Sequence, residues 1–173
     1  PDYDCFRSVR YNKRFLVQGK VLIANRGEIA IRIMNACKDL GLDYVVVYTD
    51  ADRDSQHVRL NRTEGRDKNA WRVTSYTDPN DILAVADHTL CTAIHPGYGF
   101  FSEDYRFARR VTIRDRPLVF IGPSWEVIKD LGDKINTKRV ANSLNIPTIP
   151  GTDSPIYNEM EAEEIAQRLF DVQ

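Results

Sequence analysis

The run Val21-Leu22-Ile23-Ala24, followed by Asn25-Arg26-Gly27-Glu28, decides the fold of this chain. Four consecutive apolar residues predict a short strand that is buried on both faces. The polar residues and the glycine after them indicate a turn. From Ile29 the apolar residues recur at helical spacing as far as Leu40, and Gly41 is a natural helix end. The chain therefore opens on a strand, a tight turn and a helix.

The same alternation continues along the chain. The run 44–48 predicts a second buried strand, and shorter strands are predicted at 71–73, 92–95 and 118–121. Helices are predicted to begin at Pro79, since proline suits the first turn, and after Ser102, which we expect to cap the helix that carries Tyr105 and Val111. Strands that alternate with helices predict an α/β fold, with a doubly wound parallel sheet covered by helices on both faces.

A broken helical stretch and a final helix are predicted after the last strand. Helical spacing continues to about Asn145 with a break near Gly132, and residues 146–151 look extended because of their prolines. The acidic stretch from Glu159 to Gln173 predicts a final helix. No internal repeat and no low-complexity linker interrupts this series.

Composition restricts the classes of function. The chain has 173 residues, of which 42% are hydrophobic and 28% charged, a mixture typical of globular proteins. Its formal net charge of −1 gives no basic surface for nucleic acid or for an anionic membrane. No apolar run approaches the roughly 20 residues of a membrane helix. Three dispersed cysteines and three dispersed histidines suit a reducing compartment and predict neither a disulfide framework nor a metal centre.

The loops after the strands are the places to look for a site, because ligands bind beyond the carboxyl ends of the strands in such sheets. Gly97-Tyr98-Gly99 stands between a strand and a helix, where glycine lets backbone amides approach an anion. Asp50 ends the second strand, about where a dinucleotide-binding fold keeps its ribose-binding acid. Ser102 replaces the third glycine of the dinucleotide motif, so these signals also fit ordinary turns of the fold.

The other candidate residues each have two interpretations. Lys134 is either a point charge for a phosphate or a solvated helix lysine. We expect His95 to be a hydrogen-bonded histidine rather than a base. Glu28 and Glu103 either orient a polar ligand or lie in the first turn of a helix, where the dipole favours acids.

Five segments taken together are more specific than any single turn. They are residues 20–33 (KVLIANRGEIAIRI), 50–60 (DADRDSQHVRL), 93–103 (AIHPGYGFFSE), 120–123 with 131–134 (FIGP, LGDK) and 145–151 (NIPTIPG). In this order they resemble the N-terminal part of the biotin carboxylase component of biotin-dependent carboxylases, a family that includes acyl-CoA carboxylases and pyruvate carboxylase. The resemblance covers about residues 20–155. It departs from the family at Phe101, where leucine is usual, and over residues 62–73.

The resemblance implies a domain organisation and an activity. It implies an N-terminal extension at 1–19, a Rossmann-like domain at 20–123, and at 124–173 the first helices of an incomplete, truncated ATP-grasp region. The family uses MgATP and bicarbonate to carboxylate biotin on a carrier protein. Its partners are this biotin carboxyl carrier and a carboxyltransferase subunit or domain, and a homo-oligomer is compatible with it.

The resemblance also implies roles for individual residues. Lys134 corresponds to a lysine that contacts ATP phosphate, and Tyr98 and Gly99 fall in the loop near biotin. The family's other ATP, magnesium and bicarbonate residues come after the position of Gln173, so no catalytic residue or metal ligand is expected within the chain. Phosphoryl transfer needs positioning and metal-assisted charge stabilisation, so we expect the isolated chain to be inactive.

Two alternatives stay open. One is a self-contained nucleotide- or dinucleotide-binding module, which Asp50 and the turn at 97–99 would serve. The other is a noncatalytic subunit that completes an ATP-grasp enzyme with a separate chain. The expected compartment is the cytoplasm or a mitochondrial or plastid matrix.

Overall fold

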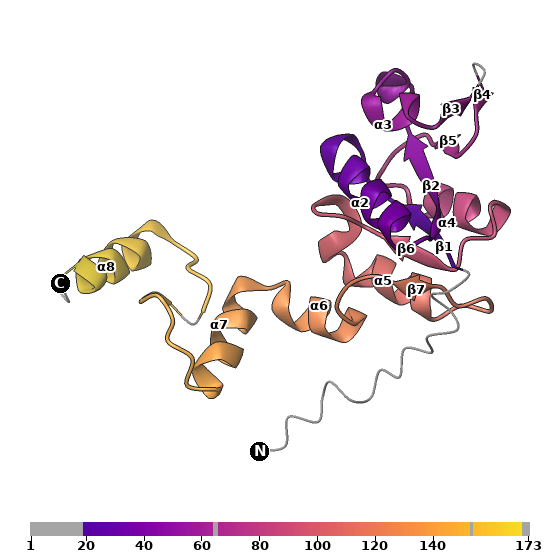
Figure 1. Ribbon diagram of the computed structural model, residues 1–173. Helices are drawn as coiled ribbons and strands as arrows, with labels where there is room; N and C mark the ends of the chain where they lie inside the picture. Colours follow the sequence, from indigo (N-terminus) through magenta and orange to yellow (C-terminus); the bar gives the residue numbers. More distant parts are fainter. Residues whose placement is uncertain (1–18, 64–65, 153, 171–173) are drawn as a thin grey trace. The chain divides into compact units, whose positions relative to one another are not determined.

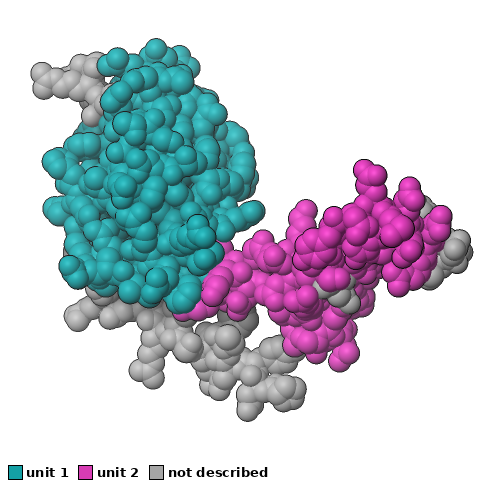
Figure 2. Space-filling view, turned by 180° about the vertical axis from the view of Figure 1, so that it is seen from behind, with its two compact units in different colours: residues 1–125 teal, residues 126–173 magenta. Residues whose placement is uncertain are grey.

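The computed structural model describes residues 19–63, 66–152 and 154–170 (Figure 1). The chain divides into two compact units, residues 1–125 and 126–173 (Figure 2). The domain boundaries expected from the sequence stay a prediction. The expected N-terminal extension lies outside the described residues, except for its last residue.

The first unit is built on a five-stranded parallel sheet in the order β5-β2-β1-β6-β7. The strands are β1 (Lys20–Ile23), β2 (Asp43–Tyr48), β5 (Ala70–Arg72), β6 (Ala93–His95) and β7 (Val119–Phe120). In chain order this is third, second, first, fourth, fifth, so the direction of winding reverses between β1 and β6. The α/β fold with a doubly wound parallel sheet is therefore confirmed.

Helices connect these strands. They are α2 (Gly27–Asp39), α3 (Gln56–Arg59), α4 (Pro79–His88) and α5 (Tyr105–Thr112), with single 3₁₀ turns η2 (Asp50–Asp52) and η3 (Phe100–Glu103). Because parallel crossovers are right-handed, α2 lies on one face of the sheet, and α4 and α5 lie on the other. A small antiparallel pair, β3 (Arg62–Thr63) and β4 (Arg66–Asp67), lies in a stretch whose polar sequence predicts no element.

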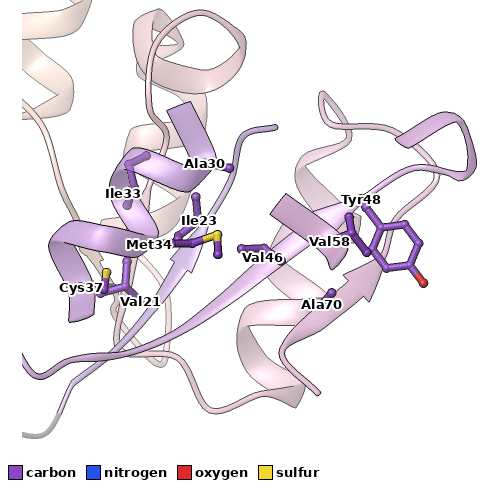
Figure 3. Close-up of a cluster of buried hydrophobic side chains, with 11 residues drawn as sticks. Val21, Ile23, Ala30, Ile33, Met34, Cys37, Val46, Tyr48, Val58 and Ala70 are labelled. Atoms are coloured by element: carbon purple, nitrogen blue, oxygen red, sulfur yellow. The ribbon is translucent and has the colours of Figure 1, made fainter. Parts of the chain in front are cut away.

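The core between α2 and the sheet follows two periodicities (Figure 3). Alternate residues of β1 and β2 face the helix, and residues three and four apart on α2 face the strands. The cluster consists of Val21, Ile23, Ala30, Ile33, Met34, Cys37, Val46, Tyr48, Val58, Ala70 and Ala93. The sequence between residues 21 and 48 thus forms one packed strand–helix–strand layer.

The helix after β6 begins later than the sequence predicts. Ser102 lies inside η3, and the N-cap of α5 is Asp104, whose carboxylate accepts hydrogen bonds from the backbone N–H groups of Arg106 (2.8 Å) and Phe107 (3.2 Å). The prediction of Ser102 as the cap was wrong, because serine and aspartate are both strong caps and stand two positions apart. Phe101, which departs from the family's usual leucine, is buried and stacks on Phe107 with a centroid distance of 3.8 Å.

The second unit is helical. Its helices are α6 (Trp125–Leu131), α7 (Lys134–Ser143) and α8 (Glu159–Phe170). Helix α6 starts at Trp125, which is the last residue of the first unit. The predicted break near Gly132 is confirmed, as is the acidic helix from Glu159, although residues 171–173 lie outside the described part. No residue of α7 is buried. Across the described residues, no helix is both long and apolar enough to cross a membrane.

Candidate functional site

The loops that follow β1 and β6 are tied together at the carboxyl edge of the sheet. Asn25, directly after β1, donates hydrogen bonds from Nδ2 to the carbonyl oxygens of Pro96 (2.7 Å) and Tyr98 (2.8 Å). Its Oδ1 accepts from the backbone N–H of Arg26 (2.9 Å), and the residue is only 2% exposed. One buried amide thus holds the turn at 97–99 beside the point where the strand order reverses.

Two glycines give this turn its shape for different reasons. Gly97 has φ +68°, and a Cβ there would lie 2.7 Å from Asn25 Nδ2, so a side chain would displace the anchoring amide. Gly99 has φ +63° with no atom near the position of a Cβ, so its backbone conformation requires glycine while the space around it stays open. Tyr98 between them has an anchored carbonyl and a residue exposure of 63%. The turn is fixed at its backbone and open at its surface.

An ionic network centred on the buried Asp52 joins the segments that follow β1, β2 and β5, while its Arg26 side chain is half exposed. The Arg26 guanidinium donates from Nε and Nη2 to the two carboxylate oxygens of Asp52, each at 2.6 Å. Asp52 is 6% exposed and also accepts hydrogen bonds from the Tyr76 hydroxyl (2.8 Å) and the Ser55 hydroxyl (3.1 Å). These donors give the carboxylate a full set of partners in place of water.

The network shifts the pKa values of its members. Hydrogen bonding from Arg26, against the opposing effect of burial, lowers the pKa of Asp52 to about 2. Burial, with the hydrogen bond to Asp52, raises the pKa of Tyr76 to about 12. At neutral pH the site therefore holds an ionised aspartate and a neutral phenol.

An aromatic stack joins this network to the turn. The Tyr76 ring stacks on Phe100, with centroids 5.4 Å apart and an interplanar angle of 15°. Phe100 has φ +43°, a left-handed conformation that a bulky residue adopts only where its surroundings hold it. A chain of contacts thus runs from Arg26 through Asp52 and Tyr76 to Phe100, the residue that follows Gly99.

Asp50, the predicted ribose-binding acid, lies outside this network. Its exposed carboxylate accepts two hydrogen bonds from Arg72, at 2.7 and 2.5 Å. The acid that pairs with Arg26 and is itself buried is Asp52. Sequence reasoning did not single out Asn25 or Tyr76. It missed Asp52 because the residue types at 50 and 52 are identical and the sequence does not show which of the two is buried.

The other candidate residues of the first unit, His95, Glu28 and Glu103, lie outside the Arg26–Asp52–Tyr76 network. His95 Nδ1 accepts a hydrogen bond from the backbone N–H of Gly97 (3.0 Å), which confirms the interpretation of a hydrogen-bonded histidine. Burial lowers the pKa of His95, which favours the neutral ring. Glu28 is exposed in the first turn of α2, and Glu103 is exposed at the end of η3.

Lys134 belongs to the second unit. It is the exposed first residue of α7, next to the N-cap Asp133, which accepts from the backbone N–H of Asn136 (2.7 Å). A cation at this end does not stabilise a helix, because the dipole places partial positive charge there. In the described part of the chain, no group of three or more His, Cys, Asp or Glu residues could hold a metal ion.

Comparison with known proteins identifies the family. Residues 17–128 match the family profile described as the biotin carboxylase N-terminal domain. Biotin carboxylase of Haemophilus influenzae is 43% identical over 151 residues, which cover 87% of this chain and 33% of that protein. The mitochondrial propionyl-CoA carboxylase alpha chain of Mus musculus is 38% identical over 162 residues, which cover 94% of this chain and 22% of that protein. The chain spans about a third of the length of such biotin carboxylases.

Solved structures agree with the sequence match. The biotin carboxylase domain of the Hydrogenobacter thermophilus 2-oxoglutarate carboxylase, a dimer in complex with MgADP and bicarbonate, superposes with a TM-score of 0.76 at 37% identity. The alignment covers 87% of this chain and 32% of that one. The family match spans the whole parallel sheet together with the turn at 97–99 and the Arg26–Asp52–Tyr76 network, and this chain belongs to the biotin carboxylase N-terminal domain family.

Proposed function

We propose that the chain serves as the N-terminal third of a biotin carboxylase, which uses MgATP and bicarbonate to carboxylate biotin on a carrier protein. The observation that carries the proposal is the family match over residues 17–128, supported by 43% identity to a biotin carboxylase over 151 residues. The fold supports it, because the anchored turn lies at the carboxyl edge of the sheet, where doubly wound proteins bind ligands.

The turn at 97–99 is the part of the site that would face biotin. Tyr98 offers an apolar ring face and a polar tip, and its exposure leaves both available to a ligand. Gly99 leaves open space where another residue would place a side chain. Biotin, when bound, supplies the ureido nitrogen that takes up the carboxyl group. The residues of this chain would wall the site and orient biotin.

Lys134 is the proposed contact to ATP phosphate. Its ammonium is exposed at a helix end where it does nothing for helix stability, and a lysine acts on phosphate as a point charge. A related domain was solved with MgADP and bicarbonate, which supports nucleotide use by the family. The described residues do not fit a magnesium site, since they contain no suitable cluster. One lysine cannot supply the charge stabilisation of phosphoryl transfer, so we propose that the isolated chain is inactive.

The partners follow from the same proposal. Relatives include biotin carboxylases, a propionyl-CoA carboxylase alpha chain and pyruvate carboxylases, and one related solved structure is a single-chain, multi-domain long-chain acyl-CoA carboxylase. A biotin carboxyl carrier and a carboxyltransferase, as subunits or as domains, would complete the reaction in which this chain takes part.

A chimera tests the proposal. Residues 19–155 replace the matching segment of the Haemophilus influenzae biotin carboxylase, and biotin-dependent ATP cleavage in the presence of bicarbonate is measured. We expect an active chimera and an inactive 173-residue chain. A correctly folded chimera without activity would refute the proposal.

Two variants of the chimera test the assigned residues. Lys134→Ala should raise the KM for ATP, whereas Lys129→Ala, which removes an exposed lysine of α6, should not. Tyr98→Ala should raise the KM for biotin and leave the KM for ATP unchanged. Equal effects of the two lysine variants would show that Lys134 is an ordinary surface lysine.

Thermal unfolding of the 173-residue chain separates the alternatives. A ligand at about 100 times its Kd stabilises a protein by roughly 2.7 kcal/mol. We expect no shift with MgATP or NAD. A shift with NAD alone would favour a self-contained dinucleotide-binding module, and a shift with MgATP alone would favour a chain that completes a nucleotide site.

A further inference from the structure

Phe100, the residue after the turn at 97–99, has a backbone conformation that its place in the chain does not explain. Among the residues that the structure describes, three besides the glycines have a positive φ: Leu90 (57°), Phe100 (43°) and Asn145 (56°). Leu90 and Asn145 each stand two positions after the last residue of a helix, where a left-handed residue commonly ends the helix. Phe100 instead begins η3. Its conformation therefore depends on contacts from elsewhere in the first unit.

The Tyr76 ring supplies such a contact. It stacks on the Phe100 ring with the centroids 5.4 Å apart and an interplanar angle of 15°, within the range of favourable aromatic pairs. The two partners differ in their surroundings, since Phe100 is 41% exposed and Tyr76 only 7%. Tyr76 is thus the fixed member of the pair, and Phe100 is the member that it holds.

Tyr76 is itself held in place without the help of Phe100. Its hydroxyl donates a hydrogen bond to Asp52 Oδ2 (2.8 Å) and accepts one from the backbone N–H of Thr49 (3.4 Å). The Arg26 guanidinium carbon lies over its ring, 6.0 Å from the centroid. These partners belong to the segments that follow β1 and β2, so Tyr76 is tied to the carboxyl edge of the sheet. Its ring can therefore act as a rigid support.

The turn is held at two places with a permissive residue between them. On one side, the Asn25 amide binds the carbonyl oxygens of Pro96 and Tyr98. On the other side, the stack on Tyr76 holds the residue after Gly99. Gly99 itself has no atom near the position of a Cβ, and glycine has the widest choice of backbone conformations. The direction in which the chain leaves Tyr98 therefore depends on the second anchor.

We propose that Tyr76 is a positioning residue for the carboxylation of biotin: its ring holds Phe100 and thereby fixes the turn at 97–99 in the conformation that receives biotin. This inference rests on the proposed function, which places biotin at that turn. Tyr76 acts through the residue after Gly99 and not by contact with biotin. A purely structural role predicts something different, because loss of the stack would then lower stability without a specific effect on biotin.

Steady-state kinetics of the chimera described above test the proposal. Tyr76→Leu removes the stacking ring, so it should raise the KM for biotin at least fivefold and leave the KM for ATP within twofold of the parent. Tyr76→Phe keeps the ring but loses the hydrogen bond to Asp52. This conservative variant should lower the Tm and yet keep the KM for biotin within twofold, which separates positioning from stability.

Trp71→Leu is the matched control. Trp71 also makes an aromatic contact in the first unit, edge-on to His88 with the centroids 4.8 Å apart, in a pair that does not include the turn. Its loss should leave the KM for biotin within twofold of the parent. A rise for Trp71→Leu equal to that for Tyr76→Leu would overturn the inference. An equal rise of the KM values for biotin and ATP in Tyr76→Leu would overturn it too.

Substitution of Phe100 tests the same stack from its exposed side, so the test does not depend on the folding of Tyr76→Leu. Phe100→Leu should raise the KM for biotin at least fivefold, whereas Phe100→Tyr, which keeps a ring, should stay within twofold. Residues that act through one shared contact are not additive. The double variant Tyr76→Leu/Phe100→Leu should therefore exceed the larger single effect by no more than twofold. A rise equal to the product of the two single effects would contradict the proposal.

Amide hydrogen exchange, followed by NMR in the 173-residue chain, gives a readout that does not require activity. The backbone N–H of Ser102 donates to the Gly99 carbonyl oxygen (2.9 Å), so its exchange rate reports on the turn. Phe100→Leu should speed this exchange at least fivefold. The backbone N–H of Val46, which donates to the Asn69 carbonyl oxygen (2.8 Å), should stay within twofold. Unchanged exchange at Ser102 would overturn the inference.

The positioning role and the proposed function can fail separately. An active chimera in which Tyr76→Leu and Phe100→Leu keep the parent KM for biotin would refute the positioning role alone. An inactive parent chimera, together with faster exchange at Ser102 in Phe100→Leu, would refute the proposed function and show that the stack holds the turn all the same.

Discussion

Replacing Asp52 by asparagine removes one negative charge from the Arg26–Asp52–Tyr76 network and leaves its shape almost unchanged. The carboxylate is buried and accepts hydrogen bonds from Arg26, Tyr76 and Ser55. An amide group offers one acceptor oxygen where the carboxylate offers two. In the parent chain Arg26 donates one hydrogen bond to each carboxylate oxygen of Asp52, and the substitution removes this paired contact.

The pKa gives the magnitude. The pKa of Asp52 falls from 3.8 to about 2 in the folded chain, and each unit of pKa corresponds to about 1.4 kcal/mol. Ionised Asp52 should thus contribute about 2 kcal/mol to the free energy of unfolding at pH 7. Because the folded pKa is depressed, this contribution is complete above the unfolded pKa near 4 and is lost as the pH falls to about 2.

Urea unfolding of the 173-residue chain, followed by circular dichroism and tryptophan fluorescence, measures the effect between pH 7 and pH 2. We expect Asp52→Asn to lose about 2 kcal/mol at pH 7 with an unchanged m-value, and the difference from the parent to vanish near pH 2. The control is Asp50→Asn, which breaks an equally short two-point pair with Arg72 that lies in solvent. Solvent screens that pair, so its loss should matter far less. Equal losses for the two variants, or a loss for Asp52→Asn that does not depend on pH, would refute the reasoning.

Three further predictions concern the turn, the cap and the second unit. Gly97→Ala should destabilise the chain more than Gly41→Ala in chemical denaturation, because both residues have positive φ but only a Cβ at 97 collides with Asn25. Gly41→Ala should cost about 1–2 kcal/mol, and a similar value for both variants would contradict the collision. Asp104→Ala should cost about 1 kcal/mol of stability and Ser102→Ala much less, and the reverse order would restore Ser102 as the cap. In hydrogen exchange, amides of α7 should exchange faster than those of β2, since α7 buries no residue, and equal protection would show that α7 is firmly packed.

Local patterns were enough to predict most of the framework. Residues 21–24 and 44–48 are continuous apolar runs, which are typical of a strand buried on both faces. The helix between them has the right spacing and a glycine at its end. Cap choice was harder, because Ser102 and Asp104 have nearly the same chemistry and the neighbouring 3₁₀ turn decides between them.

The candidate site depends on contacts between residues far apart in the sequence. Asp52 differs from Asp50 in its burial and in its hydrogen bond from Tyr76, 24 positions later. Asn25 reaches across to a carbonyl 73 residues away. Sequence patterns describe an element by itself and carry no information about what packs on it.

The strand order also has a consequence for how the chain is made. Val21 of the central strand pairs with Tyr44 on one side and with Ala93 on the other. At a synthesis rate of roughly 5–20 residues per second, Ala93 follows Tyr44 after roughly 2 to 10 seconds. During that interval the nascent layer of β1, α2 and β2 exposes an apolar face and an open strand edge, which are the features that promote association with other chains. The arrangement that brings Asn25 to the turn at 97–99 thus makes the ribosome-bound chain a candidate client for chaperones until β6 arrives.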